Sequence, residues 1–282
     1  MSIIQWNLQS YRTQFNDLKH LLSSTKPACV CLQETLARNK LNPPSGYKIF
    51  TNTPVRTDGH ERGSAILVAS SIHSKEINLD TSLQAVALRV WLGKWYSICS
   101  LYLPHVPVTR EEIHHLISQL PSPFLVLGDM NARHEFWGEP LNNDKGNIIH
   151  DIILSSNISL LNSESKTHFH VQTNSYSTID LALVSSESVL DFSHQVLDDL
   201  HGSDHYPIEI KLTENINSFN YPPRFKTEIA DWPKFWRLTD IGPNPETGTI
   251  DDQVEYIRAC IIRAANESIP KTNPRPRNKP PP

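Results

Sequence analysis

Short apolar runs, each ending in polar residues, recur along the chain as far as Leu212. Their short length and their content of Val, Ile and aromatic residues are typical of strands buried in a sheet. The runs are Ile3–Leu8, Ala28–Leu32, Ala65–Ala69, Ala85–Trp91, Tyr96–Leu103, Phe124–Leu127, Ile179–Val184 and Ile208–Leu212. The pattern therefore predicts that strands make up most of this region.

Helical spacing appears between some of these runs. Apolar residues recur at helical intervals over Phe15–Leu22, and a further helix is predicted over Asn147–Ser156. Thr109, followed three residues later by Glu112, has the form of a capping box that begins a helix. Because strands outnumber helices and several follow one another directly, the sequence predicts a mixed α/β fold rather than alternating strand–helix–strand units.

The chain changes character after about Thr213. Asn220–Pro223 has the composition of a linker, and helices are predicted around Ala230–Leu238 and over Ile250–Ser268. Pro270–Pro282 is rich in proline and carries only basic charges, so we expect it to be extended or disordered. The sequence thus predicts a main domain over 1–213, a helical extension over 214–269 and a basic linker over 270–282.

Composition narrows the classes of protein. A net charge of -4 gives no global basic signature of a DNA-coating protein, although a nuclease needs basic groups along one groove only. The four cysteines lack the paired spacing of a zinc site, and we expect them to be reduced core thiols of an intracellular protein. We expect neither secretion nor membrane anchoring, since the sequence shows no signal-peptide pattern and no run of ~18 apolar residues.

Polar side chains stand at the ends of the strand-like runs, far apart in sequence. They are Asn7, Glu34, Tyr102, Asp129, Asn131, Asp180, Asp204 and His205. Such residues converge only where strands end together on one face of a sheet. Carboxylates and amides suit a hard metal ion, and with a His–Asp pair they suit the cleavage of a phosphate ester. The residues predict a metal-dependent phosphodiesterase site.

Most of these residues also have a plainer interpretation. Glu34 is either the principal Mg²⁺ ligand or a solvated carboxylate at a strand end. Taken by itself, this residue favours neither interpretation over the other. Asp129 can orient a water and Asn131 can hold a phosphate oxygen or that water, although Gly128–Asn131 is also typical of a turn. Tyr102 is a phosphate donor or a core tyrosine.

The Asp204–His205 pair leads into the last apolar run. Asp204 can lie near the metal and His205 near the phosphate. A buried Asp180 can hold the imidazole protonated, because a paired carboxylate raises the pKa of a histidine.

In this order along the chain, these residues resemble the endonuclease/exonuclease/phosphatase superfamily, also called exonuclease III-like, from about Ile3 to Leu212. The resemblance implies a four-layer α/β sandwich of two mixed β-sheets flanked by helices, with the active site at one end. It also implies hydrolysis of a phosphodiester with Mg²⁺, which Mn²⁺ can replace, to leave a 3′-hydroxyl. By resemblance, Asn7 and Glu34 hold the metal, Tyr102 and Asn131 contact phosphate, Asp129 activates water, Asp180 partners the histidine, and Asp204 and His205 form the terminal pair, with Asp204 beside the metal.

A closer resemblance is to the endonuclease domains of jockey- and I-type non-LTR retrotransposons. It rests on Gly128–Gly138, in which Asp-x-Asn-Ala is followed by Trp-Gly, and on Thr167–Phe169, Ser177–Leu181 and Arg62–Leu67. Such elements continue into a reverse transcriptase through a basic, Pro-containing linker, which Lys271–Pro282 resembles. The resemblance implies a nuclear enzyme that nicks one strand of double-stranded DNA to prime reverse transcription.

Two residues depart from the family pattern. Gln9 stands where repair-type apurinic endonucleases carry a metal-binding Asp, which weakens a repair role and leaves metal binding more dependent on Glu34. His105 stands where many relatives have Asn, and is either a donor or a loop residue. With Arg62 and Arg133 it is a candidate substrate contact. Two alternative functions remain, a phosphatase or lipid phosphodiesterase of the same superfamily and a catalytically dead, retrotransposon-derived binding module.

Overall fold

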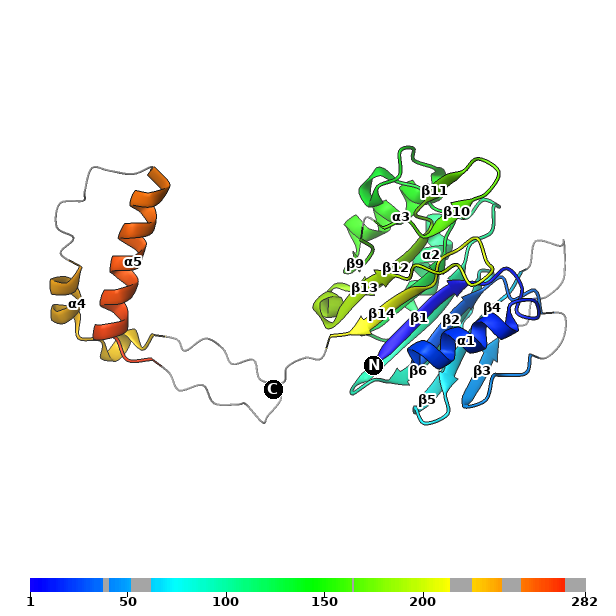
Figure 1. Ribbon diagram of the computed structural model, residues 1–282, viewed down its shortest axis with the longest axis horizontal. Helices are drawn as coiled ribbons and strands as arrows, with labels where there is room; N and C mark the ends of the chain where they lie inside the picture. The colour runs from blue at the N-terminus through cyan, green and yellow to red at the C-terminus, as the bar shows by residue number, and fades with distance from the viewer. Residues whose placement is uncertain (38–40, 52–61, 164, 214–224, 240–249, 272–282) are drawn as a thin grey trace. The chain divides into compact units, whose positions relative to one another are not determined.

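The computed structural model describes the chain except for residues 38–40, 52–61, 164, 214–224, 240–249 and 272–282 (Figure 1). The chain divides into two compact units, Met1–Thr213 and Glu214–Pro282. The predicted linker at Asn220–Pro223, and the predicted tail beyond Lys271, lie outside the described residues.

Two mixed sheets form the first unit, and each has six strands within the described residues. The first sheet has the order β13 (Phe192–Val196), β14 (Ile208–Leu212), β1 (Ser2–Asn7), β2 (Cys29–Gln33), β4 (Ser64–Ala69) and β3 (Tyr47–Thr51). The second has the order β5 (Ser74–Ile77), β6 (Gln84–Trp91), β7 (Trp95–Tyr102), β8 (Phe124–Asp129), β12 (Asp180–Ser185) and β9 (Ile158–Leu160). The pairs β1–β2 and β7–β8 are parallel, and the other pairs are antiparallel.

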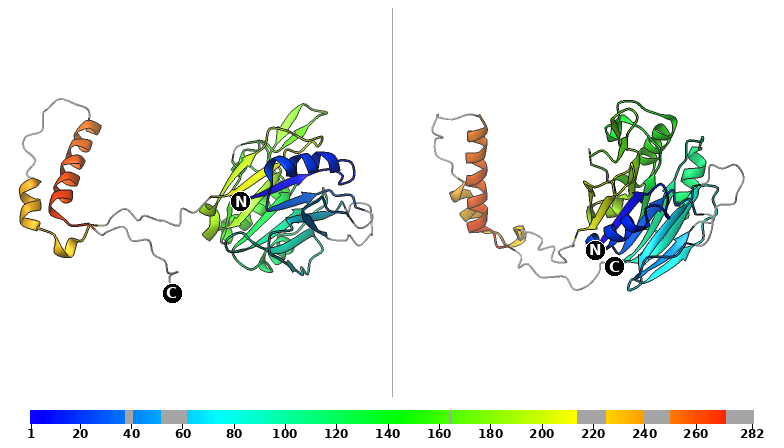
Figure 2. Two further views of the ribbon diagram at one scale, coloured as in Figure 1. Left: turned by 60° about the horizontal axis from the view of Figure 1, so that its bottom comes forward. Right: turned by 45° about the vertical axis from the view of Figure 1, so that its right-hand side comes forward.

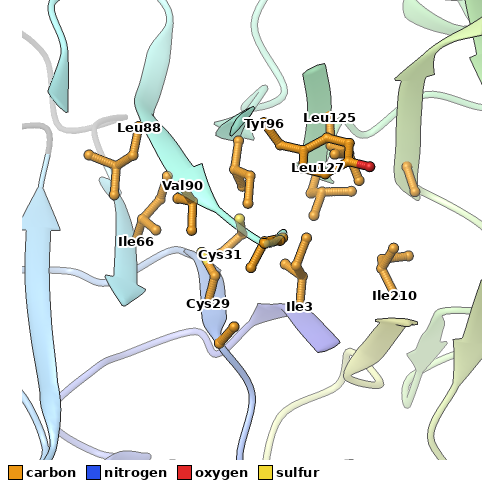
Figure 3. Packing of buried hydrophobic residues seen from close by; sticks show 14 of the residues in the cluster. Ile3, Cys29, Cys31, Ile66, Leu88, Val90, Tyr96, Leu125, Leu127 and Ile210 are labelled. Carbon is orange, nitrogen blue, oxygen red and sulfur yellow. The ribbon is translucent and has the colours of Figure 1, made fainter. Parts of the chain in front are cut away.

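The two sheets pack face to face through apolar side chains. Ile3 and Cys31 of the first sheet belong to the same buried cluster as Leu88 and Leu127 of the second (Figure 3). Alternate residues of β1 point the other way, and Ile4 packs in a separate cluster with helix α1. Because both faces of the central strands are buried, their sequences are continuously apolar rather than alternating.

Helices cover the outer faces of both sheets. Helix α1 (Phe15–Thr25) lies along the first sheet (Figure 2), and α2 (Arg110–Ser118) and α3 (Asp144–Ser155) pack on the second. The predicted capping box begins α2, with the Glu112 N–H donating to Thr109 Oγ1 at 3.2 Å and the Thr109 N–H donating to Glu112 Oε2 at 2.8 Å. The predicted four-layer α/β sandwich is confirmed.

Several elements differ from the sequence prediction. Strands β3, β5, β9 and β13, and the two strands of a separate hairpin, β10 (His168–His170) and β11 (Ser175–Ser177), were not predicted. They are short or lie at sheet edges, where partial exposure removes the apolar signal. Helix α3 begins three residues before Asn147, because the Asn143 side chain accepts a hydrogen bond from the Gly146 N–H at 2.8 Å and caps it earlier.

The second unit contains α4 (Trp232–Leu238) and α5 (Ile250–Ser268). Val254, Ile261 and Ala265 recur at helical spacing along α5; Val254 and Ile261 are 58% and 44% exposed, whereas Ala265 is buried. Short 3₁₀ helices cover Glu135–Trp137, Ser186–Asp191 and Thr227–Ile229. All four cysteines are free and buried. Among the described helices, none has the length and apolar character required to cross a membrane.

Candidate active site

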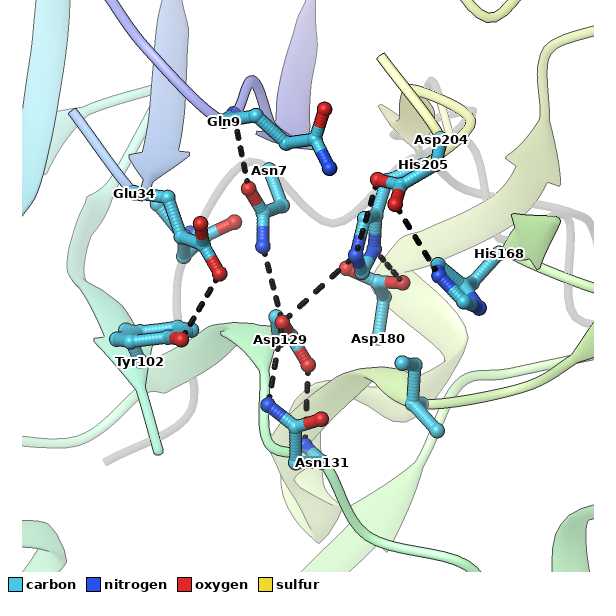
Figure 4. A network of polar contacts seen from close by, with 12 residues as sticks. Asn7, Gln9, Glu34, Tyr102, Asp129, Asn131, His168, Asp180, Asp204 and His205 are labelled. Atoms are coloured by element: carbon cyan, nitrogen blue, oxygen red, sulfur yellow. Dashed lines mark hydrogen bonds and ion pairs between the residues drawn. The ribbon is translucent and has the colours of Figure 1, made fainter. Parts of the chain in front are cut away.

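The ends of β1 and β8 meet at one end of the sandwich. Asn7 is the last residue of β1 and Asp129 the last of β8, and each strand is paired in parallel with a neighbour of its own sheet. The Asn7 Nδ2 donates to Asp129 Oδ2 at 2.9 Å, so the two sheets are joined by a polar contact at this end (Figure 4). Asp180 pairs in register with Asp129 across β12 and β8, which brings a third polar strand end to the same place.

The turn after β8 fixes the Asp129 carboxylate. The Asn131 N–H donates to Asp129 Oδ1 at 3.0 Å, and Asn131 has a left-handed φ of 47°. The Asn131 Nδ2 donates to the Leu103 carbonyl at 3.0 Å, which ties this turn to the end of β7. A Cβ atom at Gly128 would overlap the Leu101 carbonyl oxygen, so this close approach requires glycine.

His205 and Asp180 form a buried pair. The His205 Nδ1 lies 2.8 Å from Asp180 Oδ2, and Asp180 also accepts hydrogen bonds from Thr167 Oγ1 at 2.8 Å and from Gln5 Nε2 at 2.9 Å. The other ring nitrogen, Nε2, lies 3.9 Å from Asp129 Oδ2. The same nitrogen lies 3.7 Å from Asp204 Oδ1. Asp180 thus orients the imidazole so that Nε2 faces both Asp129 and Asp204.

The surroundings of His205 and Asp129 shift the pKa of both side chains. Burial opposes charge on His205, but Asp180 and the neighbouring carboxylates outweigh it and raise the pKa of His205 to about 10. Burial raises the pKa of Asp129 to about 7, although His205 partly offsets this effect. An imidazolium therefore stands beside a carboxyl group that can exchange a proton near neutral pH.

Glu34 lies in a neighbouring cluster at the same end. It follows β2, has a left-handed φ of 51°, and is largely buried. The Tyr102 hydroxyl donates to Glu34 Oε1 at 2.8 Å, and the Arg62 guanidinium lies 2.5 Å from Oε2. Burial, together with the Glu34 carboxylate, raises the pKa of Tyr102 far above its ordinary value, so Tyr102 is a neutral donor.

Asp204 lies on the opposite side of the site from Glu34 (Figure 4). Within the described part of the chain, its carboxylate belongs to the one group of three His, Cys, Asp or Glu side chains whose ligand atoms lie within 4.8 Å, together with His168 and His205. Its Oδ1 atom is buried and has no hydrogen-bond partner among the described residues. This arrangement separates the expected metal ligands Glu34 and Asp204, with Asn7 between them.

The residues present fit a hard divalent cation. Glu34, Asn7 and Asp204 offer oxygen ligands, which Mg²⁺ prefers. Glu34 is already held against one cationic group, Arg62, and the buried Asp204 Oδ1 has no hydrogen-bond partner in the described structure but lies 3.7 Å from His205 Nε2. Gln9, at the position of the expected Asp, donates its backbone N–H to Asn7 Oδ1 at 3.1 Å and adds no carboxylate.

The three candidate substrate contacts, Arg62, Arg133 and His105, have different surroundings in the structure. Arg62 joins the site through Glu34, whereas the Arg133 guanidinium lies 2.7 Å from the buried carboxylate of Glu139. Glu139 also accepts from Lys166 at 2.9 Å and from the Thr178 N–H at 2.7 Å. His105 is exposed in the loop after Tyr102.

Several residues of the site were missed from the sequence. Gln5 contacts Asp180, and Gln33 accepts a hydrogen bond from Gln5 at 2.8 Å and donates to Ser100 at 2.9 Å. The available signal was a glutamine within or at the end of an apolar strand, because a buried amide requires partners. His168, whose Nε2 lies 3.5 Å from Asp204 Oδ2, had only its place in the Thr167–Phe169 motif as a signal.

Known families and relatives match this chain. The family model "Endonuclease-reverse transcriptase" matches residues 96–209. Among Drosophila melanogaster proteins, the probable RNA-directed DNA polymerase from transposon BS is 26% identical over 98% of this chain and 32% of its own length. That from transposon X-element is 24% identical over 79% of this chain and 25% of its own. The jockey RNA-directed DNA polymerase of Drosophila funebris is 28% identical over 80% and 25%. The chain therefore spans a quarter to a third of these relatives.

Solved structures share the fold. The endonuclease domain of TRAS1, a telomere-specific non-LTR retrotransposon, has a TM-score of 0.62 at 18% identity, covering 75% of this chain and 97% of that chain. An AP endonuclease from Archaeoglobus fulgidus has a TM-score of 0.58 at 16% identity, covering 75% and 99%. The AP endonuclease of Leishmania major also has a TM-score of 0.58, at 14% identity over 74% and 86%. The chain therefore has the fold of these endonucleases and is similar in sequence to the proteins of jockey-like non-LTR retrotransposons.

Proposed function

We propose that this domain is a Mg²⁺-dependent DNA endonuclease that nicks one strand of double-stranded DNA and leaves a 3′-hydroxyl, with Mn²⁺ able to replace Mg²⁺. The observation that supports this most directly is the buried Asp180–His205–Asp129 arrangement, in which Nε2 of a charged imidazole faces a carboxyl group with a pKa near neutrality. Hydrolysis of a phosphodiester needs both a base for water and positive charge for the phosphate.

The side chains divide these tasks. Asp129, fixed by Asn7 and Asn131, accepts the proton of the attacking water. His205, held by Asp180, donates to a phosphate oxygen and stabilises the charge that develops there. Glu34, Asn7 and Asp204 are the oxygen donors that would hold a divalent cation, although Glu34 and Asp204 lie on opposite sides of the site here. Such a cation would supply Lewis-acid stabilisation of the same phosphate charge.

The remaining candidates support this arrangement. Tyr102 holds the Glu34 carboxylate through its hydroxyl, rather than being free for phosphate in this state. Asn131 orients the attacking water or a phosphate oxygen. Arg62, Arg133 and His105 contact the DNA backbone, which sets position without reading sequence.

The relatives support a role in priming reverse transcription. They are RNA-directed DNA polymerases three to four times as long as the matched segment, and the TRAS1 domain of the same fold comes from a non-LTR retrotransposon. We place this domain before a reverse transcriptase in a parent polyprotein, acting on chromosomal DNA in the nucleus. The nick would then supply the primer.

A plasmid-nicking assay tests the proposal. Supercoiled plasmid should become open circular with Mg²⁺ or Mn²⁺ and stay supercoiled with EDTA, and a DNA polymerase should extend the nick without phosphatase treatment. His205→Ala should abolish nicking while its circular dichroism spectrum matches that of the parent. Cleavage of a small phosphate ester in preference to plasmid would instead indicate a phosphatase or lipid phosphodiesterase. DNA binding with no hydrolysis of either would indicate a catalytically dead module.

A further inference from the structure

Both oxygens of the Glu34 carboxylate have partners. Tyr102 donates to Oε1 at 2.8 Å, and the Arg62 guanidinium lies 2.5 Å from Oε2. The Glu34 side chain is only 10% exposed. A cation that binds Glu34 therefore meets a positive group already in place, and the guanidinium must leave or share the carboxylate.

The Arg62 backbone is anchored independently of this ion pair. The backbone N–H groups of Arg62 and Gly63 both donate to Gln84 Oε1, at 2.9 and 2.8 Å. The Arg62 carbonyl accepts from the Leu36 N–H at 2.8 Å. The Arg62 side chain, by contrast, is 51% exposed. Rotation about its side-chain bonds can thus remove the guanidinium from Glu34 while the backbone stays fixed.

Charge decides which way the side chain turns. A divalent cation at Glu34 attracts the carboxylate more strongly than a single guanidinium does and repels the guanidinium at short range. A displaced arginine keeps its charge and presents a planar fork of donors, which matches the geometry of a phosphate group. Its fixed backbone holds it beside Glu34.

We propose that Arg62 is exchanged between Glu34 and DNA: it neutralises the carboxylate before a divalent cation binds, and it contacts a DNA phosphate once the cation takes its place. This inference rests on the proposed function, because it requires a cation at Glu34. Coupling between sites is reciprocal, so Arg62 lowers the cation affinity of the free protein and makes cation and DNA binding mutually favourable.

Cation affinity tests the first half of the exchange. Mn²⁺ is titrated into the protein without DNA, and free Mn²⁺ is measured by electron paramagnetic resonance. Arg62→Met should bind Mn²⁺ roughly two- to fivefold more tightly than the parent, the scale expected for a half-exposed ion pair. Glu34→Gln should lose this binding.

Lys211→Met is the matched control. The Lys211 ammonium lies 3.0 Å from Glu209 Oε2, and the exposures of the two side chains, 53% and 10%, nearly equal those of Arg62 and Glu34. Lys211 pairs in register with Ser2, at the end of β1 opposite Asn7. This variant removes one positive charge from a similar pair far from the site, and it should leave Mn²⁺ affinity unchanged.

DNA affinity tests the second half. The measurement uses a His205→Gln background to suppress cleavage, with a fluorescent duplex in Mg²⁺ or in EDTA. Adding Arg62→Met should weaken binding in Mg²⁺ and reduce the dependence of log affinity on log salt by about one unit, but change neither in EDTA. Adding Lys211→Met should affect DNA affinity and its salt dependence equally in Mg²⁺ and in EDTA.

The outcomes separate the two proposals. If Glu34→Gln binds Mn²⁺ as well as the parent does, the proposed cation site at Glu34 is wrong. If Glu34→Gln loses Mn²⁺ while Arg62→Met binds it no more tightly than the parent and Lys211→Met, the cation site stands and the exchange is wrong. An equal loss of DNA affinity from Arg62→Met in Mg²⁺ and in EDTA also overturns the exchange, since Arg62 then contacts DNA without release from Glu34.

Discussion

Asp180→Asn changes one atom in a buried carboxylate of the site that accepts three hydrogen bonds. Three donors converge on Asp180: Gln5 Nε2 on Oδ1, and Thr167 Oγ1 and His205 Nδ1 on Oδ2. An asparagine keeps one acceptor oxygen but points an NH₂ group at a donor whichever way it is oriented. The variant therefore loses the charge that pairs with His205 and gains an unsatisfied buried contact.

The size of both effects follows from this geometry. Breaking a buried ion pair by removing one charge costs about 3–5 kcal/mol, and the free energy of unfolding at neutral pH should fall by an amount of that order. Loss of a neighbouring carboxylate lowers a histidine pKa by roughly one to three units. In the parent, His205 has a pKa of about 10, so activity that needs the charged imidazole persists to alkaline pH and is lost as pH rises through that value. In Asp180→Asn the alkaline limb should move down into the range of about pH 7 to 9.

The assay is plasmid nicking from pH 5 to 10 at fixed Mg²⁺ and ionic strength, with urea unfolding measured on the same samples. Glu139→Gln is the matched control, because the Glu139 carboxylate is also buried and receives three donors, from Arg133, Lys166 and Thr178, without contacting His205. It should lower stability and leave the alkaline limb in place. A parent-like alkaline limb in folded Asp180→Asn would refute the assignment of Asp180 as the group that keeps His205 charged.

Three further changes test other parts of the structure. Gly128→Ala places a Cβ against the Leu101 carbonyl and should lower the free energy of unfolding by about 2 kcal/mol or more, measured in urea; a loss below about 0.5 kcal/mol would mean that the two strands separate easily. Burial lowers the pKa of His194 to about 4, so the parent should lose stability as pH falls from about 6.5 towards 4. His194→Gln should reduce this loss of stability by up to about 3 kcal/mol. An identical pH dependence of stability in the two proteins would contradict a buried, neutral His194. Ending the chain at Lys271 keeps the backbone bridge of Lys271 to Phe225 and removes only the predicted linker. Nicking should be nearly unchanged, with at most weaker DNA binding at low salt. Loss of nicking at every salt concentration would make the linker part of the catalytic unit.

The sequence by itself determined the main strands and the mixed α/β class, and its resemblance to a known superfamily implied the sandwich. A strand buried on both faces is a continuous apolar run whichever strands lie beside it. A run such as Phe124–Leu127 can therefore be recognised from the sequence alone. The helix start at Thr109 is equally local, because its capping box joins residues three apart. Edge strands such as β5 were not predictable in this way, since their exposed faces tolerate polar residues.

The sequence also indicated which polar residues gather at the site, because a carboxylate at the end of a buried strand requires a partner. Only the tertiary structure decided which partner each one has. Arg62 and Arg133 are both arginines in loops near the motifs, yet one pairs with Glu34 and the other with Glu139. Asp180 takes Gln5 as a donor across 175 residues of sequence. Such pairings depend on sheet order and on how the two sheets face each other, and no local pattern along the chain encodes either one.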